Sequence, residues 1–435
     1  MRFEDQDTYT LVVQFEQALN EGRQPYYDVE DLELILEYYL ETGGFTQMRS
    51  ALALAQEIHP LAFVFKVKEV QLDIAMKDYT KAQAKLNHLE GLNMRSVELL
   101  IARATILLHQ GDNAAGLQIL DKALENAEDP IDVLQLIIDA HLSQGNYPHA
   151  INALLKWCNM EEEEPFEESA LYQLAMCLDF TNEYDRALKL FHAFTIREPY
   201  NPLLWYQIGA FHLRKNQEKK ALQAFEWATL ADENYHPAHF EQGRIHERNE
   251  RLYDALNAYR QSISDEVPSG YIHFRIGLIE LELGAPKEAL RQFNTAIELE
   301  NDIDDIHLER AGVLMDLELY ADALKDFQRV WLEEAYGEED VLDYVECLIE
   351  LDDLDEAIRI LYDGIAKFPS AIQLRLVLSG YLIAIDELAA AQTVLAETLQ
   401  KEPKTLLLFA EYFPELPKIP AVGAILASIQ RENHD

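Results

Sequence analysis

The sequence of 435 residues is poor in cysteine, glycine and proline: it contains 3 cysteines, 17 glycines and 15 prolines. Three widely separated cysteines do not provide the close pairs of a zinc site or disulfide framework, so we expect small, buried side chains there. No apolar run of about 18 residues is present, as a membrane-spanning helix requires. The first residues, MRFEDQDTYT, lack the positive and apolar segments of a secretory signal. We therefore expect a soluble, cytoplasmic protein with no membrane partner.

Positive charge is also scarce, because 36 lysines and arginines face 78 aspartates and glutamates, for a formal net charge of -42. Such a chain repels a phosphate backbone, which excludes nucleic acid as the expected partner. Basic proteins remain possible partners, although solubility alone would also explain the acidity. The hydrophobic content of 49 % is high enough for a large core.

Motifs for catalysis are missing as well. The chain contains no glycine-rich phosphate loop, no GxSxG elbow and no HExxH pair. His239, His273 and His307 recur at a fixed spacing, but neighbouring helical hairpins stand about 10 Å apart, too far for a compact tetrahedral metal site. We interpret these histidines as structural. The expectation is a protein that is not an enzyme and has no cofactor, metal or small-molecule substrate.

What the sequence does contain is a repeat with a period of 34 residues. Within WYQIGAFHLRKNQEKKALQAF, Ala221 marks a small position and Phe225 a bulky one. Steps of 34 residues, with one slip of three, connect the small residues Ala82, Gly116, Ala150, Ala187, Ala221, Ala255, Ala289, Ala323, Ala357 and Ala391. The bulky series is Leu86, Leu120, Leu154, Phe191, Phe225, Tyr259, Phe293, Phe327, Leu361 and Leu395. Such a period is typical of a repeat architecture.

The two size classes indicate paired helices. Antiparallel helices approach closely where a side chain is small, and a bulky side chain nearby fills the adjoining space. Within each repeat the apolar residues have helical spacing, and polar stretches such as KNQEKK separate two helices. Pro60, Pro199, Pro369 and Pro403 share one phase, where the second helix must end. Each repeat therefore predicts a helical hairpin.

Trp205, Ile208, Gly209, Ala221, Phe225 and Ala228 match the pattern of the tetratricopeptide repeat, and the chain resembles that family. With Trp205 as position 4, repeats begin at residues 29, 63, 97, 131, 168, 202, 236, 270, 304, 338 and 372. The resemblance implies an all-α, right-handed α-solenoid superhelix of about eleven helix-turn-helix repeats with helical caps. It also implies a protein or peptide ligand.

These boundaries divide the chain into four parts. Residues 1–28 are expected to form an N-terminal capping helix and linker, and residues 406–435 C-terminal capping helices. Repeats 1–4 span 29–167 and repeats 5–11 span 168–405. Extra acidic residues at 160–167 interrupt the register, and they are either a solvated surface loop or a hinge between two stacks.

The resemblance implies that partners bind on the inner face, to which positions 2, 5, 9 and 13 of each repeat contribute. Four consecutive repeats place an aromatic residue at position 5, and arginines flank these rings. The candidate binding residues are Tyr172, Tyr206, Arg214, Phe240, Arg244, Arg248, Phe274 and Arg275. Guanidinium groups beside rings suit an extended peptide with apolar and acidic side chains. Alternatively, the aromatics pack between repeats and the arginines are solvated.

Three functions follow as hypotheses. The first is a scaffold or adaptor that binds a partner peptide or helix in the central groove, where residues 202–269 hold 8 basic and 10 acidic residues. The second is a peptide-responsive regulatory sensor, because stacked repeats are elastic. The third is an acidic, chaperone-like binder of basic proteins, since residues 304–405 hold 8 basic and 24 acidic residues.

Overall fold

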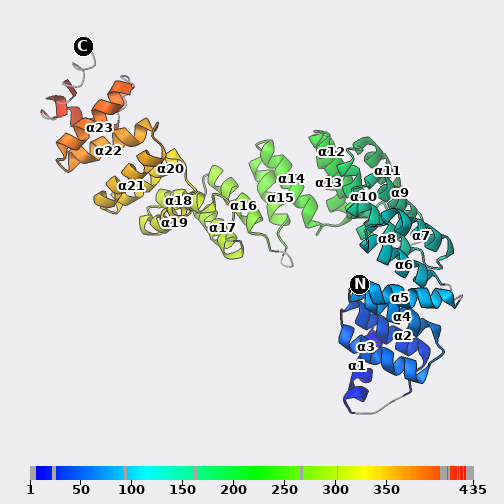
Figure 1. Ribbon diagram of the computed structural model, residues 1–435. Coiled ribbons are helices and arrows are strands. Elements are labelled where there is room, and N and C mark those ends of the chain that lie inside the picture. The colour runs from blue at the N-terminus through cyan, green and yellow to red at the C-terminus, as the bar shows by residue number, and fades with distance from the viewer. Residues whose placement is uncertain are drawn as a thin grey trace. The chain divides into compact units, whose positions relative to one another are not determined.

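The computed structural model describes residues 6–21, 26–92, 96–160, 165–264, 268–300 and 302–401, with short stretches between 409 and 427. Within these residues the protein is all-α, and Figure 1 shows a succession of helical hairpins. Helix α1 spans Gln6–Asn20 and precedes eleven pairs of helices. A short 3₁₀ helix, η1, spans Leu416–Lys418 near the C-terminus. The predicted all-α solenoid of repeated hairpins is confirmed.

We call the first helix of each pair an A helix and the second a B helix. The A helices are α2 (Val29–Glu41), α4 (Phe63–Ala75), α6 (Val97–His109), α8 (Ile131–Ser143), α10 (Glu168–Phe180), α12 (Pro202–Arg214), α14 (His236–Arg248), α16 (Gly270–Glu282), α18 (Ile306–Asp316), α20 (Glu338–Glu350) and α22 (Ile372–Ala384). The B helices are α3 (Phe45–Ile58), α5 (Tyr79–Gly91), α7 (Asn113–Asn126), α9 (Tyr147–Cys158), α11 (Tyr184–Arg197), α13 (Glu218–Ala231), α15 (Leu252–Gln261), α17 (Pro286–Leu299), α19 (Tyr320–Leu332), α21 (Leu354–Lys367) and α23 (Leu388–Lys401).

The starts of the A helices agree with the 34-residue frame. Every A helix except α18 begins at the first residue of its predicted repeat. Helix α18 begins at Ile306 rather than at residue 304, because Asp305 has a φ of 62° and cannot belong to a right-handed helix. Pro60, Pro199 and Pro369 each follow the end of a B helix by two residues, as predicted, whereas Pro403 lies outside the described residues.

The turn from each A helix to its B helix has one recurring conformation. One residue of each turn has a positive φ: Gly43, Lys77, Gly111, Gly145, Asn182, Asn216, Glu250, Gly284, Glu318, Asp352 and Asp386. The amide of the next residue donates to the carbonyl five residues earlier, for example Gln217 N to His212 O at 2.9 Å. This bond closes the helix end in the left-handed C-terminal motif. The short, fixed turn holds the two helices of a hairpin antiparallel and close together.

Small and bulky residues meet inside the hairpins, as predicted. Ala221, Phe225 and Ala228 of α13 are fully buried, and the ring of Phe225 lies against Gly209 of α12. The three cysteines, Cys158, Cys177 and Cys347, are also buried, which confirms the interpretation of them as core residues.

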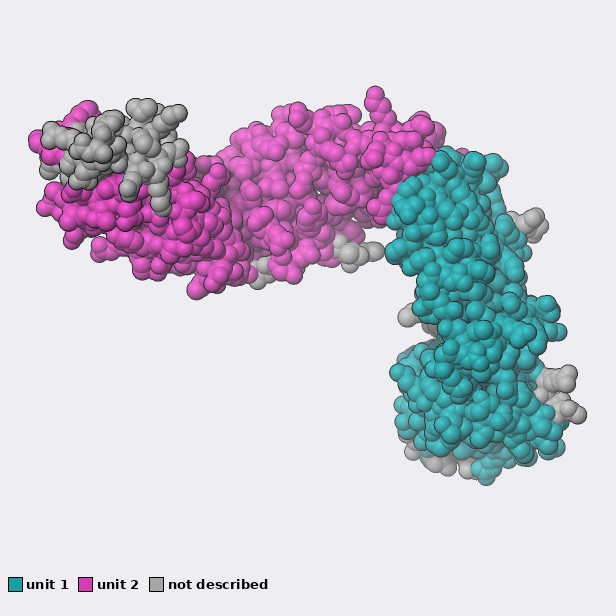
Figure 2. Space-filling view, turned by 45° about the horizontal axis from the view of Figure 1, so that its top comes forward, with its two compact units in different colours: residues 1–198 teal, residues 199–435 magenta. Residues whose placement is uncertain are grey.

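The chain divides into two compact units, residues 1–198 and 199–435 (Figure 2). Unit 1 holds α1–α11, and α1 packs on α2 through the buried side chains of Val12 and Phe15. Unit 2 holds α12–α23. Near its C-terminus the ring of Phe413 fills the space above Gly380 in α22. Most of the expected C-terminal cap lies outside the described residues.

The acidic segment 160–167 lies within unit 1, and its residues 161–164 are outside the described part. Its last residues are fixed, since the Phe166 amide donates to Glu198 Oε1 at 2.6 Å. The Arg197 guanidinium also lies 3.9 Å from the centre of the Phe166 ring. The two compact units separate after Glu198 rather than here. The division into 29–167 and 168–405 and the hinge at 160–167 stay predictions.

Candidate partner-binding surfaces

The candidate binding residues lie on consecutive A helices. Tyr172 belongs to α10 of unit 1, and the other seven belong to unit 2. Tyr206 and Arg214 lie in α12, Phe240, Arg244 and Arg248 in α14, and Phe274 and Arg275 in α16. The structure thus brings seven of the eight into three successive hairpins of one unit.

The aromatic rings of unit 2 are partly core residues. The Tyr206 ring lies 5.6 Å from that of Phe225 in its own hairpin and 5.8 Å from that of Tyr235. Phe240 has the equivalent contact with Tyr259, at 5.7 Å between ring centres. Both Tyr206 and Phe240 keep part of their surface exposed, whereas Phe274 is buried. These rings stabilise the hairpins, and the exposed parts of the Tyr206 and Phe240 rings remain accessible to a ligand.

The arginines of α14 have carboxylate partners that the repeat pattern does not indicate. Arg244 binds Glu241 on the next turn of its own helix, at 3.0 Å, and its guanidinium lies 5.9 Å from the Phe240 ring centre. Arg248 reaches across to Glu218 of α13, at 2.6 Å. Both side chains are about half exposed, so a ligand carboxylate can compete for them.

Arg275 is held more firmly than the arginines of α14. It forms an ion pair with Glu247 of α14, and Glu247 also accepts a hydrogen bond from the hydroxyl of Tyr259 at 2.7 Å. The hydroxyl is buried, and burial together with Glu247 raises the pKa of Tyr259. Arg275 therefore connects α16 to the preceding hairpin. Arg214 is exposed at the end of α12.

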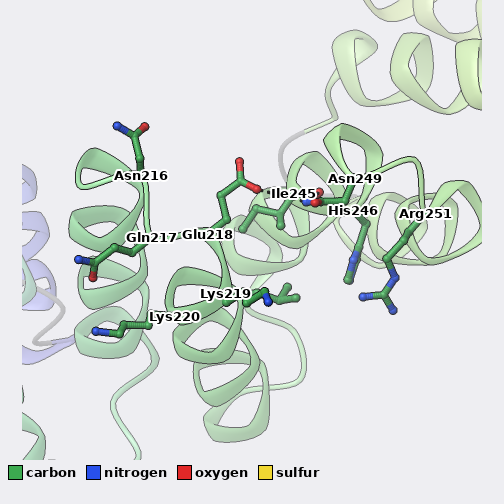
Figure 3. Close-up of a pocket in the computed structure, with 10 residues that line it drawn as sticks. Asn216, Gln217, Glu218, Lys219, Lys220, Ile245, His246, Asn249 and Arg251 are labelled. Atoms are coloured by element: carbon green, nitrogen blue, oxygen red, sulfur yellow. Dashed lines mark hydrogen bonds between the residues drawn. The ribbon is translucent and has the colours of Figure 1, made fainter.

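A cavity of about 600 Å³ lies beside these residues, at the turns of the hairpins α12–α13 and α14–α15. We call it the turn cavity. Leu222 and Ile245 contribute apolar surface, and Lys219, Lys220 and Arg251 contribute positive charge. Figure 3 shows the side chains of His246 and Arg251 pointing to the same side of α14. Burial, and secondly Arg251, lower the pKa of His246, so this imidazole is neutral at neutral pH.

Glu218 is the carboxylate at the turn cavity, and it is already engaged. It accepts a hydrogen bond from Arg248 at 2.6 Å. It accepts a second one from Asn249 at 3.2 Å, which Figure 3 shows. Lys219 and Lys220 are exposed, and no described carboxylate pairs with either of them. In a chain of net charge -42, the turn cavity is thus a local surface with free cations.

A second cavity, of about 660 Å³, lies on the exposed face of α16, α18 and α20. We call it the acidic cavity. Its floor includes the apolar side chains of Leu281, Leu308 and Met315. Seven carboxylates line it: Asp305, Glu309, Asp316, Asp340, Asp343, Glu346 and Glu350. The acidity of this part of the chain was visible in the sequence, but its concentration in one cavity depends on how the A helices stack.

The carboxylates of the acidic cavity lack cationic partners among the described residues, since none takes part in an ion pair with a described lysine or arginine. Burial, and then the charges of Asp305 and Asp340, raise the pKa of Glu309. Partial withdrawal from solvent, and then Asp340 and Glu346, raise the pKa of Asp343. The electrostatic cost of these groups is therefore not compensated within the described protein.

The recurring histidines have separate partners. His239 contacts the carbonyl of Glu233 at 2.9 Å, His273 contacts Gln292 at 2.7 Å, and His307 contacts Asp326 at 2.7 Å. No group of three or more metal-binding side chains occurs in the part of the chain that the structure describes.

Comparison with known proteins completes the description. The tetratricopeptide repeat family matches residues 240–305 and, one repeat later, residues 274–339. Residues 240–339 therefore carry tetratricopeptide repeats. The match covers most of α14 and all of α15–α19, and the hairpins outside it have the same order of helices and the same kind of turn. No curated protein matches the sequence.

Solved structures with a similar chain path include other repeat proteins. YrrB, described as a tetratricopeptide-repeat protein with an unusual peptide-binding site, is 16 % identical over 42 % of this chain and 95 % of its own, with a TM-score of 0.39. The Cut9–Hcn1 hetero-tetramer of APC/C is 12 % identical over 98 % and 93 %, with a TM-score of 0.33. A tetratricopeptide-repeat protein from Parabacteroides merdae is 14 % identical over 58 % and 98 %, with a TM-score of 0.36.

Tetratricopeptide-repeat proteins generally mediate contacts between proteins and typically have no catalytic activity of their own. Among the helices that the structure describes, none combines the length and apolarity needed to cross a membrane.

Proposed function

We propose that this tetratricopeptide-repeat protein is a non-enzymatic scaffold that binds a basic segment of a partner protein in the acidic cavity of unit 2. The observation that carries the proposal is the set of seven carboxylates around one cavity of about 660 Å³, without a described lysine or arginine paired to any of them. This develops the hypothesis of an acidic binder and assigns it to α16, α18 and α20.

The energetic argument rests on repulsion between like charges. The raised pKa values of Glu309 and Asp343 indicate that each carboxylate is charged at a cost. A lysine or arginine from a partner would relieve this cost and form charge-assisted hydrogen bonds. The aliphatic part of such a side chain would lie along Leu308 and Met315 while its charged end reaches the carboxylates.

A synthetic peptide rich in lysine and arginine tests the proposal by isothermal titration calorimetry with the full-length protein. The double variant Asp343→Asn, Glu346→Gln removes two charges from the acidic cavity. The matched control, Asp352→Asn with Asp355→Asn, removes the same charge from exposed residues outside it. We expect the first variant to weaken binding about tenfold and the control less than about threefold, since one close ion pair contributes of the order of 1 kcal/mol.

Equal weakening by the two variants would mean that the peptide responds only to net charge, and it would contradict the proposal. Binding at low salt alone, abolished at about 0.15 M salt, would lead to the same conclusion, because screening removes long-range attraction more than contact pairs.

A second candidate is an acidic and apolar peptide bound along α12–α16, the site expected from the sequence. The specific observation in its favour is the exposed Arg244 guanidinium, 5.9 Å from the ring centre of Phe240. The turn cavity adds Lys219 and Lys220 beside apolar surface. A peptide carboxylate would pair with these cations while an apolar side chain lies against the ring.

The double variant Arg244→Ala, Arg248→Ala tests this candidate with a synthetic peptide that alternates glutamate and leucine. The control Arg291→Ala, Lys325→Ala likewise removes two exposed cations, but these lie on the B helices α17 and α19, where each is paired with a carboxylate one turn away. About tenfold weaker binding by the first variant alone would support the candidate. The same affinity for both variants would eliminate it.

A further inference from the structure

A cavity of about 550 Å³ lies between α3, α4 and α5, three helices of unit 1 that are neighbours in Figure 1. We call it the α3–α5 cavity. Its apolar surface comes from Pro60, Ala62, Ala84, Leu89 and Leu92. None of the described residues that line it occupies position 2, 5, 9 or 13 of a repeat, so it is separate from the expected inner face. Its volume is within the range of small-molecule sites.

Lys66 of α4 is a half-buried cation in the α3–α5 cavity. No described residue forms an ion pair or hydrogen bond with its ammonium group. Glu69 is the carboxylate among the described residues that line the cavity, and it is already engaged, since Lys85 Nζ lies 2.8 Å from its Oε1. Lys85 also lies 2.5 Å from Oδ2 of Asp73. An ammonium group that is partly withdrawn from water without a counter-ion carries an electrostatic cost, which an external anion would relieve.

Three other repeats show how a polar side chain at the position of Lys66 is paired. Lys66 is position 4 of the second repeat, and in the eighth, ninth and eleventh repeats the partner of position 4 is residue 23 or 26 of the same repeat. These pairs are His273 with Gln292 at 2.7 Å, His307 with Asp326 at 2.7 Å and Arg375 with Glu397 at 3.5 Å. In the second repeat, residues 23 and 26 are Lys85 and His88, and neither is an anion. The second repeat therefore lacks the partner that the other three repeats supply.

In the sixth repeat the protein fills the same place with its own side chains. Trp205 and Trp227 occupy positions 4 and 26 there, and their rings stack with 5.7 Å between centres. The side chains of Lys66 and His88 fill less of this space than two indole rings. The cavity of the second repeat thus combines open volume with an unpaired cation, and both features result from the residues at positions 4, 23 and 26.

We propose that the α3–α5 cavity binds a small monocarboxylate with an apolar body, such as a short fatty acid. The carboxylate would accept a charge-assisted hydrogen bond from Lys66, and the apolar body would lie against Ala84 and Leu89. His88, which also lines the cavity, can donate a second hydrogen bond. One free ammonium group matches one negative charge, which favours a carboxylate over a dianionic phosphate. A mostly apolar lining with few polar groups is typical of small-molecule sites.

Octanoate tests the proposal with the full-length protein, by titration followed with saturation-transfer NMR at about 0.15 M salt. At this ionic strength, exposed charges more than about 8 Å away are largely screened, so the net charge of -42 opposes binding little. Octanamide has the same apolar chain without the charge, and acetate has the charge without the chain. We expect octanoate to bind at least about tenfold more tightly than either control.

Two variants locate the binding site. Lys66→Met removes the ammonium group but keeps an unbranched apolar side chain, so it should weaken octanoate binding about tenfold and leave octanamide binding unchanged. The matched control Lys189→Met removes an exposed lysine of α11, which also has no described partner, and should leave the affinity for octanoate unchanged. The double variant Lys66→Trp, His88→Trp copies Trp205 and Trp227 and should abolish binding of both octanoate and octanamide. Circular dichroism shows whether each variant keeps its helices.

Two results would overturn the proposal. One is equal affinity of wild type for octanoate and octanamide, or equal affinity of wild type and Lys66→Met for octanoate. The other is tighter, Lys66-dependent binding of an acetylated peptide that ends in leucine, because the ligand would then be the C-terminus of a partner protein. The variant Asp343→Asn, Glu346→Gln should bind octanoate like wild type, which separates this site from the acidic cavity.

Discussion

The ring of Phe225 occupies the space that a side chain at Gly209 would need. A Cβ atom added to Gly209 would lie 2.5 Å from Cε1 of Phe225, closer than van der Waals contact allows. The same relationship holds between Gly243 and Tyr259, at 2.7 Å, and between Gly277 and Phe293, at 2.6 Å. Three successive hairpins of unit 2 are thus closed by a buried ring on a glycine of the A helix.

Replacing Gly209 by alanine should destabilise the protein by about 1–3 kcal/mol, because the ring of Phe225 is buried and cannot move away freely. The control is Gly312→Ala, which lies inside α18 with no atom within 4 Å of the added Cβ. That change should stabilise by up to about 1 kcal/mol through helix propensity. Urea unfolding measures both. A loss of stability at Gly312 as large as at Gly209 would show that steric contact is not the cause.

These contacts explain why the fold could be predicted. The spacing between Gly209 and Phe225 recurs in the sequence because each hairpin repeats the same local contact, and local contacts follow from sequence period. The start of α18 could not be predicted to the residue. The left-handed φ of Asp305 results from how this one connection is accommodated, and the repeat period contains no information about it.

The candidate binding surfaces were predicted less completely than the fold, because they depend on contacts between hairpins. Arg248 was identified, but its partner Glu218 lies 30 residues away and meets it only through the packing of α13 on α14. The exposure of Met176 and Phe180, at 39 % and 61 %, was not predicted, because apolar residues at helical spacing usually belong to the core. Which face of α10 is covered depends on its neighbours, and only the structure provides this.

The turns between A and B helices offer a second test. Lys77 has a φ of 62°, which is costly for any residue with a Cβ, and no described residue pairs with its side chain. Lys77→Gly should therefore stabilise unit 1 by up to about 1 kcal/mol. Gly111 has a φ of 85° in the next turn, and Gly111→Ala should destabilise by a similar amount, although no atom lies within 4 Å of the added Cβ. Thermal unfolding measures both variants. If the two substitutions shift the melting temperature in the same direction, the backbone conformation of these turns does not determine the effect.

A buried carboxylate connects α18 with α19. Asp326 is 2 % exposed and accepts hydrogen bonds from His307 at 2.7 Å and from Arg310 at 2.7 and 2.8 Å. Asp326→Ala leaves these donors without their acceptor and should cost about 3–5 kcal/mol. Asp322→Asn, which affects an exposed pair with Lys325, should cost less than about 1 kcal/mol. Comparable losses in urea unfolding would contradict a structural role for the Asp326 network.

The acidic cavity should give stability and affinity opposite dependences on pH. Because the pKa of Glu309 is raised by folding, the folded state binds its proton more tightly than the unfolded state. Stability therefore falls as the pH rises from the ordinary to the raised pKa. Affinity for a basic peptide should rise over the same interval, since the carboxylate becomes charged.

The variant Glu309→Gln isolates the contribution of this residue. Wild type should lose stability relative to the variant as the pH rises from the ordinary to the raised pKa of Glu309. Above that interval the difference between their unfolding free energies should stay constant. A difference independent of pH would show that Glu309 does not titrate abnormally.

The three cysteines can report on the two units separately. Burial raises the pKa of each thiol to about 11, so the native protein should react slowly with a thiol reagent near pH 8. Cys158 lies in unit 1 and Cys347 in unit 2, where Cys347 belongs to a hydrophobic cluster that includes α20–α22. Because each repeat is stabilised mainly by its neighbours, the two units can unfold at different urea concentrations. Labelling in increasing urea, followed by mass spectrometry of the peptides, should thus give different urea midpoints for Cys158 and Cys347. A common midpoint would mean that the repeats unfold as one cooperative structure and that the division after Glu198 has no energetic counterpart.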